Sequence, residues 1–151
     1  MAQFSFIPSG EASELADDLR ELFDELAATL PRHHRAASGE CRPTLDVLET
    51  DDTVEVLVDV AGIPREAIRV IFRDGVLLVA GEKAPVAAES PRSFHLVERE
   101  FGRFARAVRL KGAFDVRQSR ATVRDGELTV VLRKLVERRG AAHRIPVDST
   151  R

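Results

Sequence analysis

Apolar and polar residues alternate along residues 54–60, which form the clearest periodic pattern in the chain. Valines at 54, 56, 58 and 60 are separated by Glu55, Leu57 and Asp59. Because successive side chains of a strand point to opposite faces of a sheet, this pattern predicts a strand with one buried face. Shorter apolar runs predict further strands at residues 45–47, 68–72, 76–81, 104–110 and 128–132.

Two of these strand pairs meet at the same tripeptide, Arg-Asp-Gly, at residues 73–75 and 124–126. The Asp side chain can bond its own backbone and Gly accepts a positive φ, so each tripeptide predicts a hairpin turn. A third copy is lacking, which favours two hairpins within one sandwich over a solenoid. Several short strands without alternating helices predict an antiparallel β-sandwich.

A different period precedes the strands. Six apolar residues fall at helical spacing and end just before a proline: Leu15, Leu19, Leu22, Phe23, Leu26 and Leu30. They predict an amphipathic helix whose apolar face must be buried, either on its own chain or against another molecule. The polar linker at residues 32–40 favours the intermolecular alternative.

Composition narrows the function classes. The chain has 151 residues, enough for one domain with arms, and its 23 basic and 25 acidic side chains give a net charge of -2, so no field favours nucleic acid. No apolar run has the length of a membrane span, and the N-terminus lacks a leader pattern. One cysteine, Cys41, fits a reducing compartment. We therefore expect a cytoplasmic protein without nucleic-acid or membrane partners.

The chain carries no pattern typical of a catalytic, cofactor or metal site. His33 and His34 are adjacent but lack nearby Cys or carboxylate ligands at fixed spacing, so we expect them to face solvent. Neither His95 nor His143 has a neighbouring nucleophile, and there is no Gly-x-x-x-x-Gly-Lys-Ser/Thr phosphate loop. The sequence therefore predicts no enzyme, no cofactor and no metal.

The pattern Ala-x-x-x-Asp-Gly-x-Leu-x-Val at residues 121–130 resembles the signature of the α-crystallin domain, which defines the small heat shock proteins (Hsp20 family), here of the bacterial type. Further matches occur in the expected order: Pro43-x-x-Asp46-Val47, Ala61-Gly62-Ile63, Gly81-Glu82-Lys83, Glu98-Arg99-x-x-Gly102-x-Phe104-x-Arg106 and Ile145-Pro146-Val147. The resemblance implies an all-β fold, an antiparallel immunoglobulin-like sandwich at residues 42–135. An N-terminal arm with the amphipathic helix (1–41) would precede it, and a flexible C-terminal tail (136–151) would follow.

The resemblance also implies a dimer in which residues 93–97 of one subunit pair with the partner's strand at residues 45–48. The predicted interface comprises Phe94, His95, Leu96, Val97, Leu45, Val47 and Arg106. The alternative is a hairpin folded back on its own sheet. Arg106 shares a strand face with three apolar residues, and a buried charge must be paired. Glu98 or Glu100 of either subunit is the expected partner.

The tail motif implies a second contact between subunits. Ile145 and Val147 face the same way in an extended chain, and Pro146 restricts the backbone, so the motif can add to a neighbour's sheet edge and fill two pockets. The predicted receiving groove is formed by Ile68, Val70, Phe72, Leu128, Val130 and Leu132.

The predicted function is an ATP-independent holdase that works as a homo-oligomer built from dimers and keeps non-native client proteins from aggregating. Predicted client-binding residues are Phe4, Phe6, Leu15, Leu19, Leu22, Phe23 and Leu26. A monomeric co-chaperone resembling the p23/CS domain is the alternative from another class. An enzyme built on scattered Asp, Glu and His residues has no supporting spacing.

Overall fold

The computed structural model describes residues 9–32, 39–85 and 90–135. In chain order the elements are α1 (Ser9–Thr29), β1 (Leu45–Glu49), β2 (Thr53–Asp59), the short 3-10 helix η2 (Arg65–Ala67), β3 (Ile68–Arg73), β4 (Val76–Lys83), β5 (Gly102–Arg109), β6 (Phe114–Arg124) and β7 (Glu127–Lys134).

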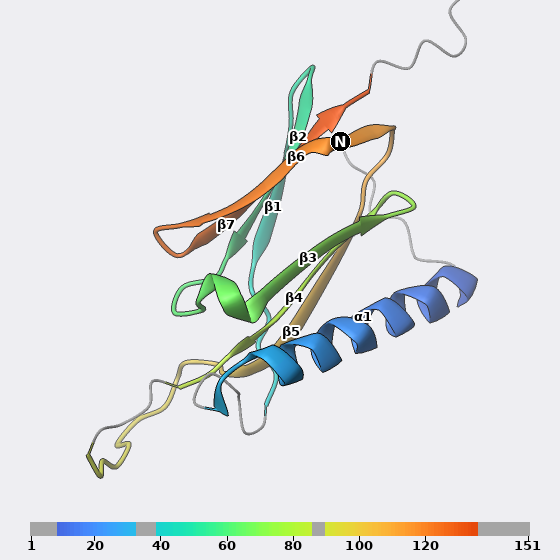
Figure 1. The fold of residues 1–151 in the computed structure, drawn as a ribbon. Helices are drawn as coiled ribbons and strands as arrows, with labels where there is room; N and C mark the ends of the chain where they lie inside the picture. The colour runs from blue at the N-terminus through green and yellow to red at the C-terminus, as the bar shows by residue number, and fades with distance from the viewer. Residues whose placement is uncertain (1–8, 33–38, 86–89, 136–151) are drawn as a thin grey trace, which may run out of the picture.

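The strands form two antiparallel sheets, with the order β1-β2-β7-β6 in one and β3-β4-β5 in the other. The sheets face each other, and α1 lies across the outer face of the three-stranded sheet (Figure 1). The predicted antiparallel sandwich with one N-terminal helix is therefore confirmed.

Both predicted hairpin turns are confirmed, and they lie in different sheets. Asp74 and Gly75 join β3 to β4 with φ of 49° and 78°, and Asp125 and Gly126 join β6 to β7 with φ of 51° and 81°. Two consecutive positive φ values belong to the tight turn whose twist matches that of antiparallel strands. The repeated tripeptide thus forms the same kind of tight turn once in each of the two sheets.

The main core fills the space between the sheets. The alternating valines of β2 point into it, together with the inward residues of β4, β5 and β7. β4 is buried on both faces, because Leu77 and Val79 enter the main core while Leu78 and Ala80 lie in a second cluster that includes Leu22 of α1. This explains why β4 reads as a continuous apolar run instead of an alternating one.

The structure corrects the prediction for the helix. The polar linker at residues 32–40 favoured burial of the helix against another molecule, yet α1 packs on its own sheet, and Leu22 and Leu26 are 6% and 0% exposed. An uncovered β4 face would expose Leu78 and Ala80, which is the physical reason for this packing. Residues 93–97 form neither a strand nor a hairpin on their own sheet in this single subunit.

Candidate functional site

An open groove runs along the side of the sandwich where β5 and β1 end their two sheets. It has a volume of about 880 Å³ and is lined by Leu19, Phe23, Glu40, Cys41, Arg42, Leu45, Glu100, Arg103, Phe104, Ala105, Arg106, Ala107 and Val108. We call it the edge groove. Its walls come from α1, the segment before β1, and β5, so residues far apart in sequence meet there.

The start of β5 is covered by the segment that leads into β1. The N–H of Arg103 donates to the Gly39 carbonyl at 3.2 Å, and the N–H of Cys41 donates to the Arg103 carbonyl at 3.1 Å. The two chains approach so closely that a Cβ on Gly102 would lie 2.0 Å from the Gly39 oxygen. Beyond this short contact, β5 continues as the outer strand of its sheet.

Arg106 lies half-buried in the edge groove, on the same strand face as buried Phe104 and Val108, as predicted. Its Nη1 donates to the Pro43 carbonyl at 2.6 Å. Burial lowers the pKa of Arg106, and the positive charge of Arg42 lowers it further. Among the residues that the structure describes, no carboxylate lies within ion-pairing distance of Arg106. Glu98 and Glu100 are exposed, and neither pairs with Arg106 in this subunit.

Arg103 links β5, a wall of the edge groove, to α1, and the sequence did not predict this role. Its Nε donates to Oε1 of the buried Glu82 at 3.0 Å, and its guanidinium lies 4.9 Å from the centre of the Phe23 ring. A buried carboxylate paired with an arginine that also covers an aromatic ring joins β4, β5 and α1. Glu82 directly follows the apolar run at residues 76–81 of β4, and this position is the sequence signal for such a pair.

Cys41 lies at the mouth of the same groove, with its thiol 3.6 Å from the Gly102 carbonyl oxygen. Partial burial raises the pKa of this thiol, with Lys83 acting in the opposite direction. A raised pKa leaves less thiolate, so Cys41 has the environment of a packing residue.

The segment of residues 93–97, which we call the exchange segment, is exposed. The exposed fractions of Phe94, Leu96 and Val97 are 73%, 74% and 58%, and His95 is also exposed. The described residues 90–97 of the connection between β4 and β5 project away from the sandwich in Figure 1. Large apolar side chains are seldom left together in water without a partner.

β1, the predicted partner of the exchange segment, is an outer strand of the four-stranded sheet. Leu45 and Val47 are half-buried against the main core, and the neighbouring Leu48 is exposed. One side of β1 pairs with β2 over Leu45–Glu49, and its other side has no paired strand in the described chain. The structure thus presents an apolar segment and an outer strand of equal length in one subunit.

On the opposite side of the sandwich, β3 and β6 are the outer strands of their sheets. Phe72 of β3 meets Phe114 of β6 edge to face, with ring centres 5.5 Å apart. Of the predicted groove residues on β3, Ile68 is buried while Val70 and Phe72 are half-buried. The predicted groove residues on β7, Leu128, Val130 and Leu132, are 2%, 3% and 2% exposed and belong to the main core.

Several predicted residues lie outside the described ranges or against the subunit's own body. Phe4, Phe6 and the tail motif Ile145, Pro146 and Val147 belong to the first group, as do His33, His34 and His143. The predicted client-binding residues of α1 belong to the second group, since Leu15, Leu19, Leu22, Phe23 and Leu26 all pack on the sandwich.

The described residues contain neither a metal-binding cluster nor a helix that could span a membrane. Within 9–32, 39–85 and 90–135, no three His, Cys, Asp or Glu side chains are grouped so that they could hold a metal ion. In the same ranges, no helix combines the length and apolar character needed to cross a bilayer.

The sequence matches the family model of the Hsp20/alpha crystallin family over residues 46–148. It is 31% identical over 121 residues to heat shock protein 16 of Schizosaccharomyces pombe, covering 78% of this chain and 83% of that protein. It is 29% identical over 138 residues to a chloroplastic 26.7 kDa heat shock protein of Oryza sativa subsp. japonica, covering 87% of this chain and 58% of that one.

Among solved structures, the fold is similar to a small heat-shock protein of Xylella fastidiosa that is described as having a distinct high order structure. The TM-score is 0.60 at 25% sequence identity, and the match covers 72% of this chain and 98% of that one.

Proposed function

The chain belongs to the Hsp20/alpha crystallin family of small heat shock proteins, and from this premise we propose that it is an ATP-independent holdase built from dimers. Family membership implies a chaperone that holds non-native proteins and is not an enzyme. The arrangement of subunits, the contacts between them and the client-binding residues are our own proposals.

The observation that carries the assembly proposal is that one subunit has both an exposed apolar segment and an outer strand with one side that no described strand pairs with. The exchange segment exposes Phe94 and Leu96, and β1 has one side without a paired strand in the described chain. Strand addition between two subunits satisfies both, because backbone groups of β1 gain partners while apolar side chains leave water. Burying Phe94 and Leu96 contributes about 1.5–3 kcal/mol each before ordering costs.

Arg106 supports the same interface. Its half-buried guanidinium has a carbonyl partner in its own subunit, and the edge groove opens beside β1. A glutamate carried by the exchanged loop of the partner, at position 98 or 100, would supply the missing charge. Such a pair fixes register and orientation more than it adds affinity.

The second proposed contact is tail docking along β3 and its neighbouring outer strand β6. The half-buried Val70 and Phe72 offer apolar surface beside an outer strand. The Ile145-Pro146-Val147 motif would add there as a short strand. Because β7 is the inner neighbour of β6, its Leu128, Val130 and Leu132 would form the floor beneath the docked tail. Many such weak contacts hold a large assembly while each remains reversible.

Client binding follows from reversible exposure. A partly unfolded protein presents apolar surface, and the chaperone offers its own when subunit contacts open. The proposed surfaces are the apolar stripe of α1, together with Phe4 and Phe6, and the strands freed when a tail leaves. In this subunit the stripe is packed on the sandwich, so its use requires α1 to move.

The function is tested by heating a model client with and without the protein and following aggregation by light scattering in the absence of nucleotide. Substoichiometric protein is expected to suppress scattering. Unchanged scattering would refute the holdase proposal.

A monomeric p23/CS-like module is the competing function, and it predicts a single mass at all concentrations. Sedimentation velocity distinguishes the two, because a monomer at micromolar concentration is incompatible with an oligomer built from dimers. The bacterial type stays a prediction, because the similar proteins come from Schizosaccharomyces pombe as well as from Xylella fastidiosa. A cytoplasmic location also stays a prediction, because one relative is chloroplastic.

A further inference from the structure

The helix α1 and the residue after it, Leu30, contact two apolar clusters, and Phe23 packs against both. Leu26 and Leu30 belong to the main core between the sheets. Leu22 instead joins Leu78 and Ala80 of β4 in a second cluster, with Leu15, Leu19, Phe23 and Ile71 at its margin. We call this second group the outer cluster. The outer cluster lies on the outer face of the three-stranded sheet (Figure 1). Residues 9–25 of α1 can therefore lift while Leu26 and Leu30 stay in the main core, and only the half-buried Phe23 leaves the margin of that core.

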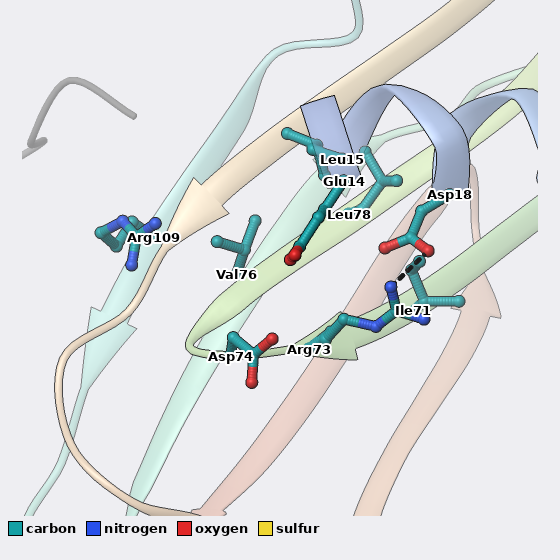
Figure 2. A pocket seen from close by; sticks show the side chains of 9 residues that line it. All are labelled: Glu14, Leu15, Asp18, Ile71, Arg73, Asp74, Val76, Leu78 and Arg109. Carbon is teal, nitrogen blue, oxygen red and sulfur yellow. Dashed lines mark ion pairs between the residues drawn. The ribbon is translucent and has the colours of Figure 1, made fainter. Parts of the chain in front are cut away.

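The N-terminal half of α1 is also incompletely packed. A pocket of about 190 Å³, partly open to solvent, lies beside it (Figure 2). Its lining comes from the helix (Glu14, Leu15 and Asp18) and from the sheet side (Ile71, Arg73, Asp74, Val76, Leu78 and Arg109). Because this pocket opens to solvent, the first turns of α1 contact less protein than a filled interface would provide.

Two ion pairs align the helix along β3. Asp18 Oδ1 lies 2.7 Å from Arg73 Nη1, and Figure 2 shows this pair joining α1 to the end of β3. Glu25 Oε1 lies 2.9 Å from Arg69 Nε. The Asp18 side chain is only 10% exposed, so the Arg73 pair is shielded on its acidic side.

The spacing of the two ion pairs matches the geometry of a helix that lies along a strand. Asp18 and Glu25 are separated by two helical turns, about 10 Å along the axis at 1.5 Å per residue. Arg73 and Arg69 are four strand residues apart, about 13 Å. The two lengths agree within the reach of the side chains. An acidic amphipathic helix running antiparallel to β3 therefore matches both the apolar strip and its arginines.

We propose that the strip formed by Ile71, Leu78 and Ala80, with Arg69 and Arg73 along it, is an interaction surface for acidic amphipathic helices of non-native proteins. Residues 9–25 of α1 occupy this surface in the resting subunit, and a client helix replaces them. Leu26 and Leu30 keep the end of α1 attached in the main core while Asp18 and Glu25 leave Arg73 and Arg69. This inference rests on the proposed holdase function and names the client feature that this face selects.

The test measures binding of a fluorescein-labelled peptide with the sequence of residues 11–27 to the full-length chain by anisotropy. In the wild-type chain its own helix competes with the peptide, so binding is weak. The variant Asp18→Arg places a positive charge against Arg73 in the resident helix, whereas the peptide keeps its aspartate. We expect the apparent Kd to fall at least tenfold, because the fraction of subunits with an accessible strip rises.

The matched control is Asp17→Arg, one position earlier. The Asp17 side chain is 72% exposed and pairs with Arg20 of its own helix, so the same charge change leaves the strip covered and the Kd at its wild-type value. Adding Arg73→Asp to Asp18→Arg restores an ion pair of reversed polarity, and the resident helix again excludes the peptide. Far-UV circular dichroism of each variant verifies that the sandwich is intact.

Three results would overturn the inference. Asp18→Arg binds the peptide no better than Asp17→Arg does. A peptide with lysine at positions 18 and 25 binds equally well, which would mean general stickiness without selection for acids. Asp18→Arg enlarges the oligomer and the peptide reverses this, which would make α1 of a second copy the occupant. Suppression of client aggregation by the wild-type protein is measured separately, so failure of the holdase function is distinguishable from failure of this surface.

Discussion

The exchange segment makes the sharpest prediction about assembly. Replacing Phe94 and Leu96 by serine removes the apolar side chains with the largest exposure among those that the structure describes. In the single subunit they contact little, so the free energy of unfolding of the monomer should stay within about 0.5 kcal/mol of the wild type. Any larger effect must therefore come from contacts between subunits.

The expected magnitude follows from the area that these side chains would bury at the interface. Both side chains together contribute about 3–6 kcal/mol of apolar burial. Even the lower figure weakens dimerisation by roughly a hundredfold, since each 1.4 kcal/mol is a factor of ten. Dimers stable at micromolar concentration would then dissociate into monomers.

The assay separates the two kinds of contact by using the tail variant as the background. Ile145→Gly with Val147→Gly is expected to leave dimers, so adding Phe94→Ser and Leu96→Ser should reduce the species to monomers in sedimentation velocity. Val116→Ser is the matched control, because Val116 is also exposed at 55% but lies on β6. A dimer that persists with all four substitutions would refute exchange through this segment.

Further predictions test the other features of the fold. Ile145→Gly with Val147→Gly alone should shrink the oligomer towards dimers in native mass spectrometry, and an unchanged mass would remove the tail from assembly. Arg106→Ala should weaken the dimer by about 1–2 kcal/mol through a lost charge-assisted hydrogen bond, whereas an unaltered dimer Kd would show that its only role is the Pro43 contact. Gly81→Ala should lower the free energy of unfolding by about 2 kcal/mol or more, because its Cβ would lie 2.4 Å from the Ala67 carbonyl oxygen; a chemical unfolding curve identical to that of the wild type would contradict this close approach. Lys134 on β7 hydrogen-bonds Glu49 and holds the pKa of that carboxyl below its usual value. The ionised Glu49 therefore stabilises the folded state above its unfolded pKa, and this stability is lost as the pH falls through its folded pKa. The effect is small at an exposed site, and thermal unfolding of Glu49→Gln should show a flatter dependence on pH than the wild type does.

The features that the sequence predicted well depend on local chemistry. The two Arg-Asp-Gly turns require positive φ at successive residues, and the alternating valines of β2 require one buried face. Both can therefore be predicted without knowledge of the rest of the chain. The half-buried position of Arg106 follows in the same way from its place among apolar residues of β5.

The features that it did not predict depend on which surfaces meet. A stripe of leucines shows that α1 must be buried but does not identify the surface that covers it. Asp18 held a usable signal, since it lies one turn from Leu15 and from Leu22 and so at the margin of the stripe, where a carboxylate needs a basic partner. Similarly, the apolar face of β7 predicted burial correctly, but strand order decides that β6 is the outer strand next to it.

The regularity of the outer strands provides a reason why two different segments would serve two different edges. β1 offers five residues in regular register with β2, which matches the five residues of the exchange segment. β6 is irregular, because its register against β7 shifts between Asp115 and Arg120, and Asp115 accepts hydrogen bonds from the Arg117 N–H and from Gln118 Nε2 inside the bulge. A bulge twists and blunts an outer strand, so the regular stretch after it, residues 120–124, is the part that can receive an added strand. The three-residue tail motif buries less apolar area than the five-residue exchange segment would, so its contact is the one that opens first under stress.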